Sequence, residues 1–228
     1  LKKNQLENFK KNNMEDKIIL NSTELTGVVG KNEMNKLSLV VEQKAWNDYR
    51  KKYDMASNLE LLDFPIQLDF ELNSSCNLKC PMCPISAESP KGKGKSTWFD
   101  FEFYKELIDY SVKHGTKAIK LNYINEPLIR NDFIKFIDYA KTKGILDIYF
   151  STNGILLTEK VSENLIKSGL TRLQVSIDAV TQDTYEKVRP GGSLEKVITN
   201  LENFLKIKKK LNSTIPLVRV NFVKTTFN

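Results

Sequence analysis

Between residues 66 and 223 the sequence alternates four times between a short strand pattern and a longer helical pattern, and a fifth strand pattern follows. In residues 66–72 apolar and polar side chains alternate with the period of two that a half-buried strand requires. Regular alternation of this kind predicts a parallel sheet with right-handed helical crossovers. The strands are expected at 66–72, 118–123, 146–150, 173–177 and 217–223, and the helices at 98–114, 132–143, 159–167 and 194–211.

A partial parallel (β/α) barrel fits this α/β pattern better than a flat sheet, because the distinctive polar residues follow the carboxyl ends of strands. A flat doubly wound sheet would use the same positions, so this placement alone does not decide. We expect a core domain at residues 64–228, preceded by an N-terminal extension at residues 1–63. A weak helical period at residues 37–53 predicts an apolar stripe that docks on the core: Leu39, Val40, Ala45 and Trp46.

The chain of 228 residues carries a net charge of +7, which raises the question of a nucleic-acid partner. The lysines are spread along the chain, and the densest run, residues 206–210, falls where the cations face the negative end of a predicted helix. Nucleic acid is therefore not expected as a partner. No apolar run approaches the roughly 18 residues of a membrane span, and no secretory signal is visible.

Cys76, Cys80 and Cys83 are the only cysteines, in the spacing CxxxCxxC. Clustered thiols fit a reducing compartment, so we expect the protein in the cytoplasm. Three thiolates can hold three irons of a cubane cluster and leave the fourth iron open, whereas an electron-transfer cluster would require a fourth cysteine. A structural zinc site would also require four ligands, and the lone His114 is the available fourth. His114 ends a predicted helix that runs away from the loop, which disfavours zinc.

This loop, placed directly after the first predicted strand, resembles the cluster loop of the radical S-adenosylmethionine (SAM) superfamily, in particular its maturase-like branch. The resemblance implies a 4Fe-4S cluster on the three cysteines, with the open iron chelated by the amino and carboxylate groups of SAM. Met82 stands where the family usually has an aromatic residue near the adenine, and a thioether can also pack on a purine.

Two later segments add to the resemblance. Ile124-Asn125-Glu126-Pro127 resembles the Gly-Gly-Glu-Pro segment of the family, so Asn125 and Glu126 are expected at the SAM ammonium. Ser151-Thr152-Asn153-Gly154 resembles a stretch that contacts the ribose and methionyl parts, which implies roles for Ser151 and Asn153. Both segments also read as ordinary turns, since Asn-Gly favours left-handed backbone.

The segment Ser176-Ile177-Asp178-Ala179 and the downstream Arg189 resemble the part of the family that binds the SAM carboxylate. Ser176 and Arg189 are the expected contacts, Arg189 through its planar fork. For Asp178, a ligand role and a role in capping the next turn are equally open.

The resemblance implies a core of six strands, of which five are expected here, so the edge of the fifth strand should lack its partner and the core should be truncated at its C-terminal end. Similar chains often continue into a cysteine-rich SPASM domain. The implied activity is reductive cleavage of SAM to a 5′-deoxyadenosyl radical that abstracts hydrogen from a peptide or a sugar- or aminoglycoside-like substrate. A reductant such as flavodoxin or ferredoxin would supply the electron. The alternatives are a non-catalytic Fe-S/SAM-binding module, and an RNA-modifying radical SAM enzyme suggested by the charge of +7.

Overall fold

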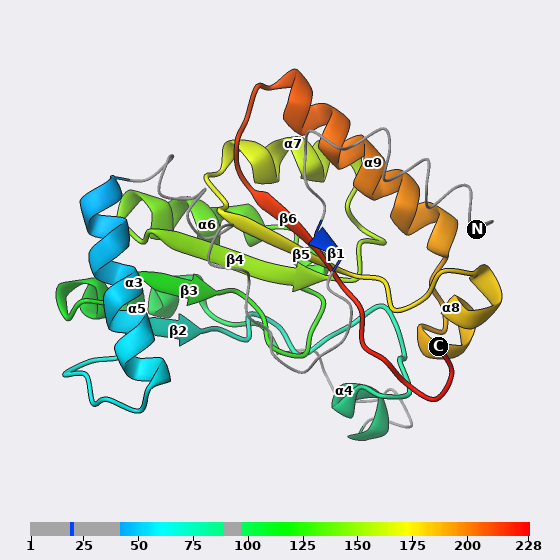
Figure 1. Cartoon of the computed structure of the whole chain (residues 1–228), viewed down its shortest axis with the longest axis horizontal. Coiled ribbons are helices and arrows are strands. Elements are labelled where there is room, and N and C mark those ends of the chain that lie inside the picture. Colours follow the sequence, from blue (N-terminus) through cyan, green and yellow to red (C-terminus); the bar gives the residue numbers. More distant parts are fainter. Residues whose placement is uncertain (1–18, 21–41, 89–96) are drawn as a thin grey trace.

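The computed structural model describes residues 19–20, 42–88 and 97–228. Within these residues, parallel strands form one sheet in the order β1-β6-β5-β4-β3-β2 (Figure 1). The five strands predicted from the sequence are confirmed, although β2 and β3 are shorter than expected. The strands are β1 Ile19–Leu20, β2 Gln67–Asp69, β3 Ala118–Lys120, β4 Asp147–Thr152, β5 Arg172–Ser176 and β6 Leu217–Asn221.

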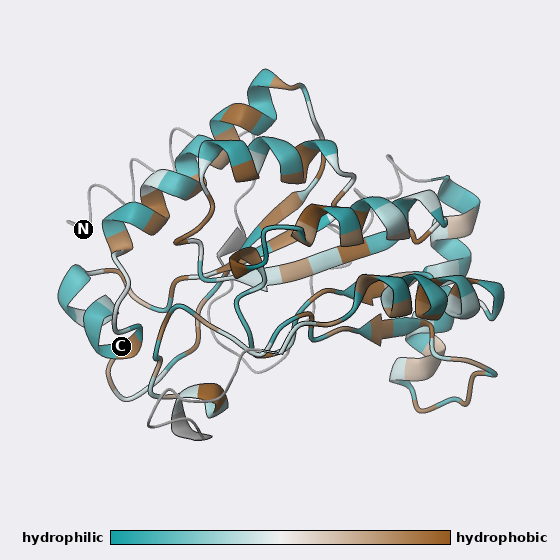
Figure 2. Cartoon of the chain, turned by 180° about the vertical axis from the view of Figure 1, so that it is seen from behind, coloured by the Kyte–Doolittle hydropathy of each residue, from teal (hydrophilic) through white to brown (hydrophobic). Residues whose placement is uncertain are grey.

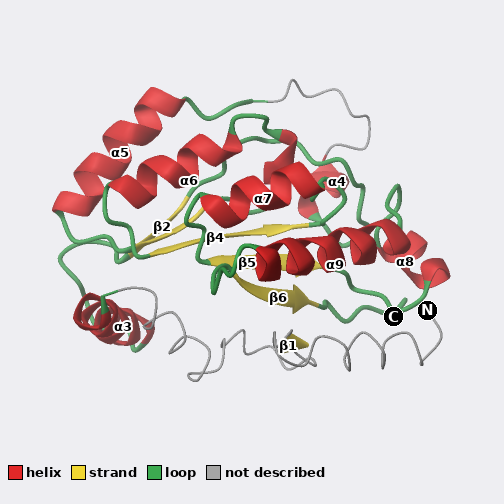
Figure 3. Ribbon diagram, turned by 90° about the horizontal axis from the view of Figure 1, so that it is seen from above, coloured by secondary structure: helices red, strands yellow, loops and turns green. Residues whose placement is uncertain are grey.

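The four predicted crossover helices, α5, α6, α7 and α9, are also confirmed, and they lie together on one side of the sheet (Figure 3). Three of them begin where an N-cap side chain accepts a hydrogen bond from the first turn: Asp100, Thr158 and Ser193. The helices are α3 Gln43–Ser57, α4 Pro84–Glu88, α5 Phe101–Lys113, the 3-10 helix η1 Pro127–Ile129, α6 Phe133–Thr142, α7 Glu159–Lys167, α8 Gln182–Val188 and α9 Leu194–Lys210.

The core lies between the sheet and these four helices. Phe150, Leu173 and Val218 are neighbours in register on β4, β5 and β6, and all three are buried. The helices turn their apolar stripes toward this sheet face and leave polar residues outside (Figure 2). Burial of this apolar area drives the association of the two layers.

The opposite sheet face is polar. Ser151, Gln174 and Arg219 form one row in register across β4, β5 and β6, and Ser176 lies beside Asn221 in the next row. All five residues are half-buried. Because side chains alternate between the two faces of a strand, the apolar rows and these polar rows necessarily face opposite ways. We call this polar surface the inner face.

The fifth predicted strand, β6, has a partner on the edge that the sequence analysis expected to be unpaired. β1 pairs with β6 in parallel, with Ile19 opposite Arg219 and Leu20 opposite Val220. The expectation of an edge without a partner is therefore wrong for these two positions. Apart from Ile19 and Leu20, residues 1–41 lie outside the described part of the chain.

Helix α3 lies across the end of the sheet where the strands begin (Figure 1), which we call the amino end. Trp46 and Tyr49 are buried and pack in one cluster with Ile66 and Ala118. Of the predicted apolar stripe, Trp46 is buried and Ala45 is half-buried, whereas Leu39 and Val40 lie outside the described residues. The division at residue 63 stays a prediction, although α3 is packed tightly on the core.

The lysine run lies at the C-terminal end of a helix. Lys208, Lys209 and Lys210 occupy the last turn of α9, as predicted, and Lys208 is buried along its stem. Within the described ranges, the chain contains no helix whose length and hydropathy would let it cross a membrane.

Candidate functional site

The cysteine loop lies at the opposite end of the sheet, where β2 to β6 finish, which we call the carboxyl end. Cys76 follows β2, and its Sγ accepts a hydrogen bond from the N–H of Leu78 at 3.5 Å. Cys83 N donates to the carbonyl of Cys80 at 3.0 Å, which makes the tight turn that leads into α4. The turn after α8 supports the loop, since Lys79 N donates to the carbonyl of Pro190 at 3.5 Å.

The thiols are close enough to influence one another's ionisation. The pKa of Cys76 is raised and that of Cys80 is raised to about 11, chiefly by burial and in smaller part by the charges of neighbouring cysteines. Arg189 acts in the other direction on both thiols. Iron ligation requires thiolates, so a cationic cluster would have to supply the charge that makes deprotonation favourable in this buried setting.

Among the described residues, no three Cys, His, Asp or Glu side chains already stand in the arrangement of an assembled metal site. The loop thiols would therefore rearrange on ligation. The donor set nevertheless fits a 4Fe-4S cluster with one open iron, because three thiolates lie within one loop. His114 does not complete a zinc site: its Nδ1 lies 2.7 Å from the carbonyl of Tyr110, and its ring stacks on Tyr110 at the amino end.

Glu126 ties the loops of the carboxyl end together. Its carboxylate accepts hydrogen bonds from Thr152 Oγ1 at 2.8 Å, Asn153 N at 2.8 Å and Leu128 N at 3.1 Å. Its own backbone N–H donates to the carbonyl of Ser75 at 2.9 Å, directly before the first cysteine. Burial raises the pKa of Glu126 to about 7, because three neutral donors do not offset the loss of hydration. The predicted contact of Glu126 with the SAM ammonium stays a prediction, and the structure adds this internal role.

Asn153 reaches the cysteine loop from β4. Its Nδ2 donates to Asn77 Oδ1 at 2.7 Å and lies 3.9 Å from Cys76 Sγ. The adjacent Gly154 has a φ of +76°, and a Cβ there would come within 3.0 Å of Val197. The predicted Asn-Gly turn is therefore required by both backbone and packing.

The side-chain amide of Asn125 indicates a missing partner, because the residue is only 7% exposed. Both polar atoms of its amide are buried and have no hydrogen-bond partner in the described structure. Buried amides are almost always paired, so an unpaired one indicates a group that is absent here. Asn125 stands in the segment expected to bind SAM.

Glu71 is a residue that the sequence reasoning missed. Its carboxylate accepts hydrogen bonds from Ile124 N at 2.8 Å and Asn125 N at 3.3 Å, and burial raises its pKa. It thus shapes the loop in which Ile124 and Asn125 replace two glycines. A carboxylate at the end of the first alternating strand was the available signal.

Arg189 and Asp178 form a buried ion pair. The guanidinium donates through Nε at 2.8 Å and through a second nitrogen to the same Oδ2, and both side chains are largely buried. Asp178 has a φ of +59°, and its Oδ1 accepts from Val223 N at 2.6 Å. The sequence left two roles open for Asp178, and neither anticipated that it would orient Arg189. Within the described part of the chain, two of the five Arg189 N–H donors are used in this pair, which leaves three for another acceptor.

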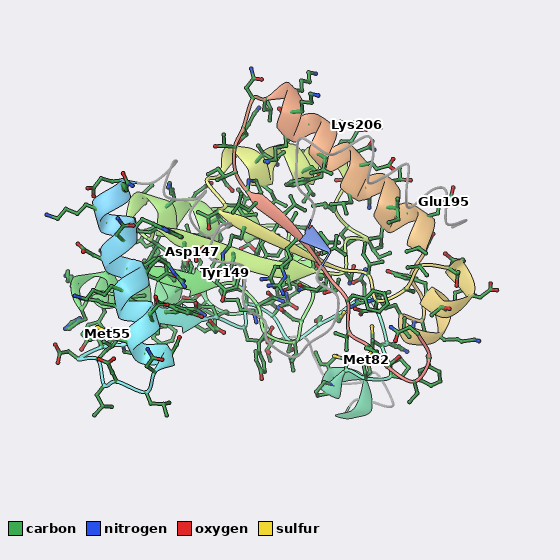
Figure 4. All side chains as sticks on the ribbon, in the orientation of Figure 1. Met55, Met82, Asp147, Tyr149, Glu195 and Lys206 are labelled. Atoms are coloured by element: carbon green, nitrogen blue, oxygen red, sulfur yellow. The ribbon has the colours of Figure 1, made fainter. Side chains whose placement is uncertain are left out.

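The other predicted site residues also lie at the carboxyl end. Ser151 Oγ donates to Gln174 Oε1 at 2.9 Å, and Asn221 Nδ2 donates to the same oxygen at 3.2 Å. Ser176 lies beside Asn221 on the inner face. Met82 is 39% exposed next to α4 and lies far from Asp147 and Tyr149 near the amino end (Figure 4). Gln174 thus shares one polar row with the predicted Ser151, and Asn221 shares the next row with the predicted Ser176.

Comparison with solved structures supports the fold. SuiB of Streptococcus suis, solved with its precursor peptide SuiA, matches with a TM-score of 0.59 at 16% identity over 98% of this chain and 45% of that one. The native anSMEcpe structure with bound AdoMet matches with a TM-score of 0.54 at 20% identity over 69% of this chain and 44% of that one.

Curated sequences are more similar. A probable GTP 3′,8-cyclase of Methanocaldococcus jannaschii is 32% identical over 161 residues, which cover 71% of this chain and 50% of that protein. The mycofactocin maturase MftC of Mycolicibacterium smegmatis is 33% identical over 146 residues, 62% of this chain and 35% of that protein. The chain thus spans half or less of the length of these relatives.

The model of the family described as the radical SAM superfamily matches residues 70–222, which include the cysteine loop and all the strands from β3 to β6. The cysteine spacing, the partial parallel barrel and this match agree. The chain therefore belongs to the radical SAM superfamily, a family of enzymes whose cofactors are a 4Fe-4S cluster and SAM.

Proposed function

We propose that this chain carries the SAM-cleaving site of a radical SAM enzyme that acts on a hydrogen-bonding small molecule or peptide. When bound, the cluster and SAM would supply the 5′-deoxyadenosyl radical that abstracts hydrogen from the substrate. Cys76, Cys80 and Cys83 would hold the cluster. The observation that carries this proposal is the convergence of the cysteine loop, Asn153 and Arg189 on one end of the sheet.

SAM would lie over the carboxyl end of the sheet, between the cysteine loop and the ends of β4, β5 and β6. The unpaired amide of Asn125 offers donors and an acceptor for its amino-acid part. Arg189 has N–H donors left for the carboxylate, while Asp178 fixes the plane of the guanidinium. Met82, Ser151 and Ser176 are proposed contacts for the remainder of the molecule.

The substrate would face the polar rows of the inner face. Gln174 uses its Oε1 to accept from Ser151 and Asn221, which leaves its amide N–H groups for a ligand acceptor. Such a row favours a substrate rich in hydroxyl or amide groups, whether a sugar or aminoglycoside-like molecule or a peptide backbone. A flavodoxin or ferredoxin in the cytoplasm is the proposed electron donor, because the reaction consumes one electron.

The first test is anaerobic reconstitution of the full chain with iron and sulfide. We expect about four irons per chain, formation of 5′-deoxyadenosine once SAM and the reductant dithionite are added, and loss of both in Cys76→Ala, Cys80→Ala and Cys83→Ala. Ser86→Ala lies in α4 outside the ligand set and is the matched control, which should keep its iron. A cluster that forms without 5′-deoxyadenosine would favour the non-catalytic module instead.

The RNA-modifying alternative rests on the charge of +7 alone. Its test is RNA binding measured over a range of salt concentration, since phosphate contacts make affinity fall steeply with salt. Absence of such binding at low salt would exclude it.

A further inference from the structure

The hydroxyl of Tyr185 in α8 is another buried polar group that lacks a hydrogen-bond partner in the described structure. The residue is 0% exposed, and its Oη makes no hydrogen bond within the described structure. Nothing in the site described so far uses it. A buried hydroxyl without a partner costs stability, so its retention calls for a reason.

The position of this hydroxyl is tightly constrained. A Cβ at Gly192 would lie 2.8 Å from Tyr185 Cε1 and 3.3 Å from Oη, so only glycine leaves room for the phenol end of the ring. Gly191 in the same turn lies against Leu78, and Pro190 accepts from Lys79 N. The phenol end thus packs against the turn at residues 190–192, and the same turn contacts Leu78 and Lys79 of the cysteine loop.

The charged groups that act on Tyr185 are Arg189, Cys80 and Asp178. Arg189 has no acceptor atom. The carboxylate of Asp178 already accepts hydrogen bonds from Arg189 through Oδ2 and from Val223 through Oδ1. The remaining ionisable neighbour is Cys80, which directly follows Lys79, the residue whose N–H donates to Pro190 in the turn that packs on Tyr185. Its sulfur becomes a strong acceptor only when it is a thiolate in a bound cluster, after the loop thiols have rearranged.

We propose that Tyr185 is a positioning residue that donates a hydrogen bond to the Cys80 thiolate once the 4Fe-4S cluster is bound, and that it thereby raises the reduction potential of the cluster. Hydrogen bonds to cluster sulfurs stabilise the more negative, reduced state, which is the physical basis of this effect. The inference rests on the proposed cluster site at Cys76, Cys80 and Cys83.

The matched pair of variants is Tyr185→Phe and Tyr104→Phe. Tyr104 is equally buried, but its Oη donates to the carbonyl of Phe136 at 2.9 Å, away from the cysteine loop. Both substitutions remove one buried hydroxyl and keep the ring. They therefore differ only in whether the protein itself supplies the partner.

In the cluster-free chain, Tyr185→Phe should leave the urea midpoint unchanged or raise it, whereas Tyr104→Phe should lower it. In the reconstituted chain, EPR-monitored redox titration should place the potential of Tyr185→Phe below that of the wild type and leave Tyr104→Phe unchanged. A wild type that binds no iron would refute the proposed function. A loaded Tyr185→Phe with the wild-type potential would refute the role of Tyr185 alone.

If Tyr185→Phe takes up too little iron for the redox titration, the urea midpoints of the cluster-free chains still test the inference. A urea midpoint that falls as far in Tyr185→Phe as in Tyr104→Phe would show that the hydroxyl has a partner in the cluster-free protein, and the proposal would be overturned.

Discussion

The two ends of the sheet each bury a carboxylate, but they satisfy it differently. At the amino end, Asp147 is 0% exposed and accepts from Tyr49, Thr171 and Arg172, the last through both Nε and a terminal nitrogen. At the carboxyl end, the described donors to the Glu126 carboxylate are all neutral, and the amide of the adjacent Asn125 is buried without a partner in the described structure. The carboxylate at the amino end is therefore paired with a cation, whereas the groups that donate to Glu126 in the described structure include no cation.

This difference indicates that the amino end of the sheet serves stability and the carboxyl end serves function. A carboxylate with a cation and a full set of donors fixes β4, β5 and α3 at the amino end. Glu126, in contrast, has a raised pKa and lies next to the unpaired amide of Asn125. Strongly shifted pKa values are typical of functional sites, where the fold tolerates unfavourable electrostatics. In parallel barrels the loops after the strands carry the chemistry, and this chain follows that division.

The largest effect that separates the two ends is expected for Asp147→Asn. Removing the carboxylate leaves the guanidinium of Arg172, whose side chain is 11% exposed, without its counter-charge. We expect a loss of about 3–5 kcal/mol in the unfolding free energy, measured by urea denaturation of the cluster-free chain. Asp69→Asn is the control, since Asp69 is exposed and accepts only from Gln67, so it should change stability little. Equal losses in both would remove the contrast between the ends.

A second, smaller effect is the pH dependence contributed by Glu126. Its folded pKa is about 7, above the ordinary value of 4.5, so the fold favours the protonated carboxyl. This contribution is fully present below pH 4.5 and is lost as pH rises through 7, by about 3 kcal/mol.

Glu126→Gln should remove that slope, because an amide does not titrate. The comparison is the difference between wild type and variant in unfolding free energy from pH 4.5 to 8, measured without cluster. Glu71 has a raised pKa in the same region, but it is present in both chains and cancels. Parallel pH profiles for the two chains would mean that Glu126 ionises normally.

The smallest effect is expected from two glycines with similar backbone. Gly154 at the carboxyl end and Gly144 at the amino end have φ values of +76° and +86°. Alanine at either should cost about 1 kcal/mol of backbone strain. At Gly154 the new Cβ also meets Val197 at 3.0 Å and Val175 at 3.2 Å, whereas nothing lies within 4 Å of the one at Gly144. Gly154→Ala should therefore lower the melting temperature more than Gly144→Ala, and the reverse order would contradict this packing.

The sequence predicted the frame of the molecule because that frame follows from local periodicity. The alternating 66–72 segment, the helix stripes and the glycines after helices each report on a few neighbouring residues. The cysteine loop was equally legible, since its ligands are contiguous. The crossover helix α7 begins and ends where its pattern predicts, and its N-cap Thr158 accounts for its start.

The remaining features depend on contacts between distant residues. Asp178 pairs with Arg189 only because α8 brings the chain back, and Glu71 reaches Ile124 only because β2 and β3 are paired neighbours in the sheet. Likewise, β1 lies about 200 residues from its partner β6 in the chain, so its pairing left no local signal. The polar rows of the inner face became visible only when the register was known.

The left-handed backbone of Asp178 restricts how this site can change through evolution. Asparagine tolerates a φ of +59° but carries no charge for Arg189, and glutamate carries the charge but strains the backbone. Glycine relieves the backbone and loses both hydrogen-bonding partners of the carboxylate. No single substitution keeps both properties, so a lineage that abandoned Asp178 would have to redesign Arg189 and the segment after β6 at the same time.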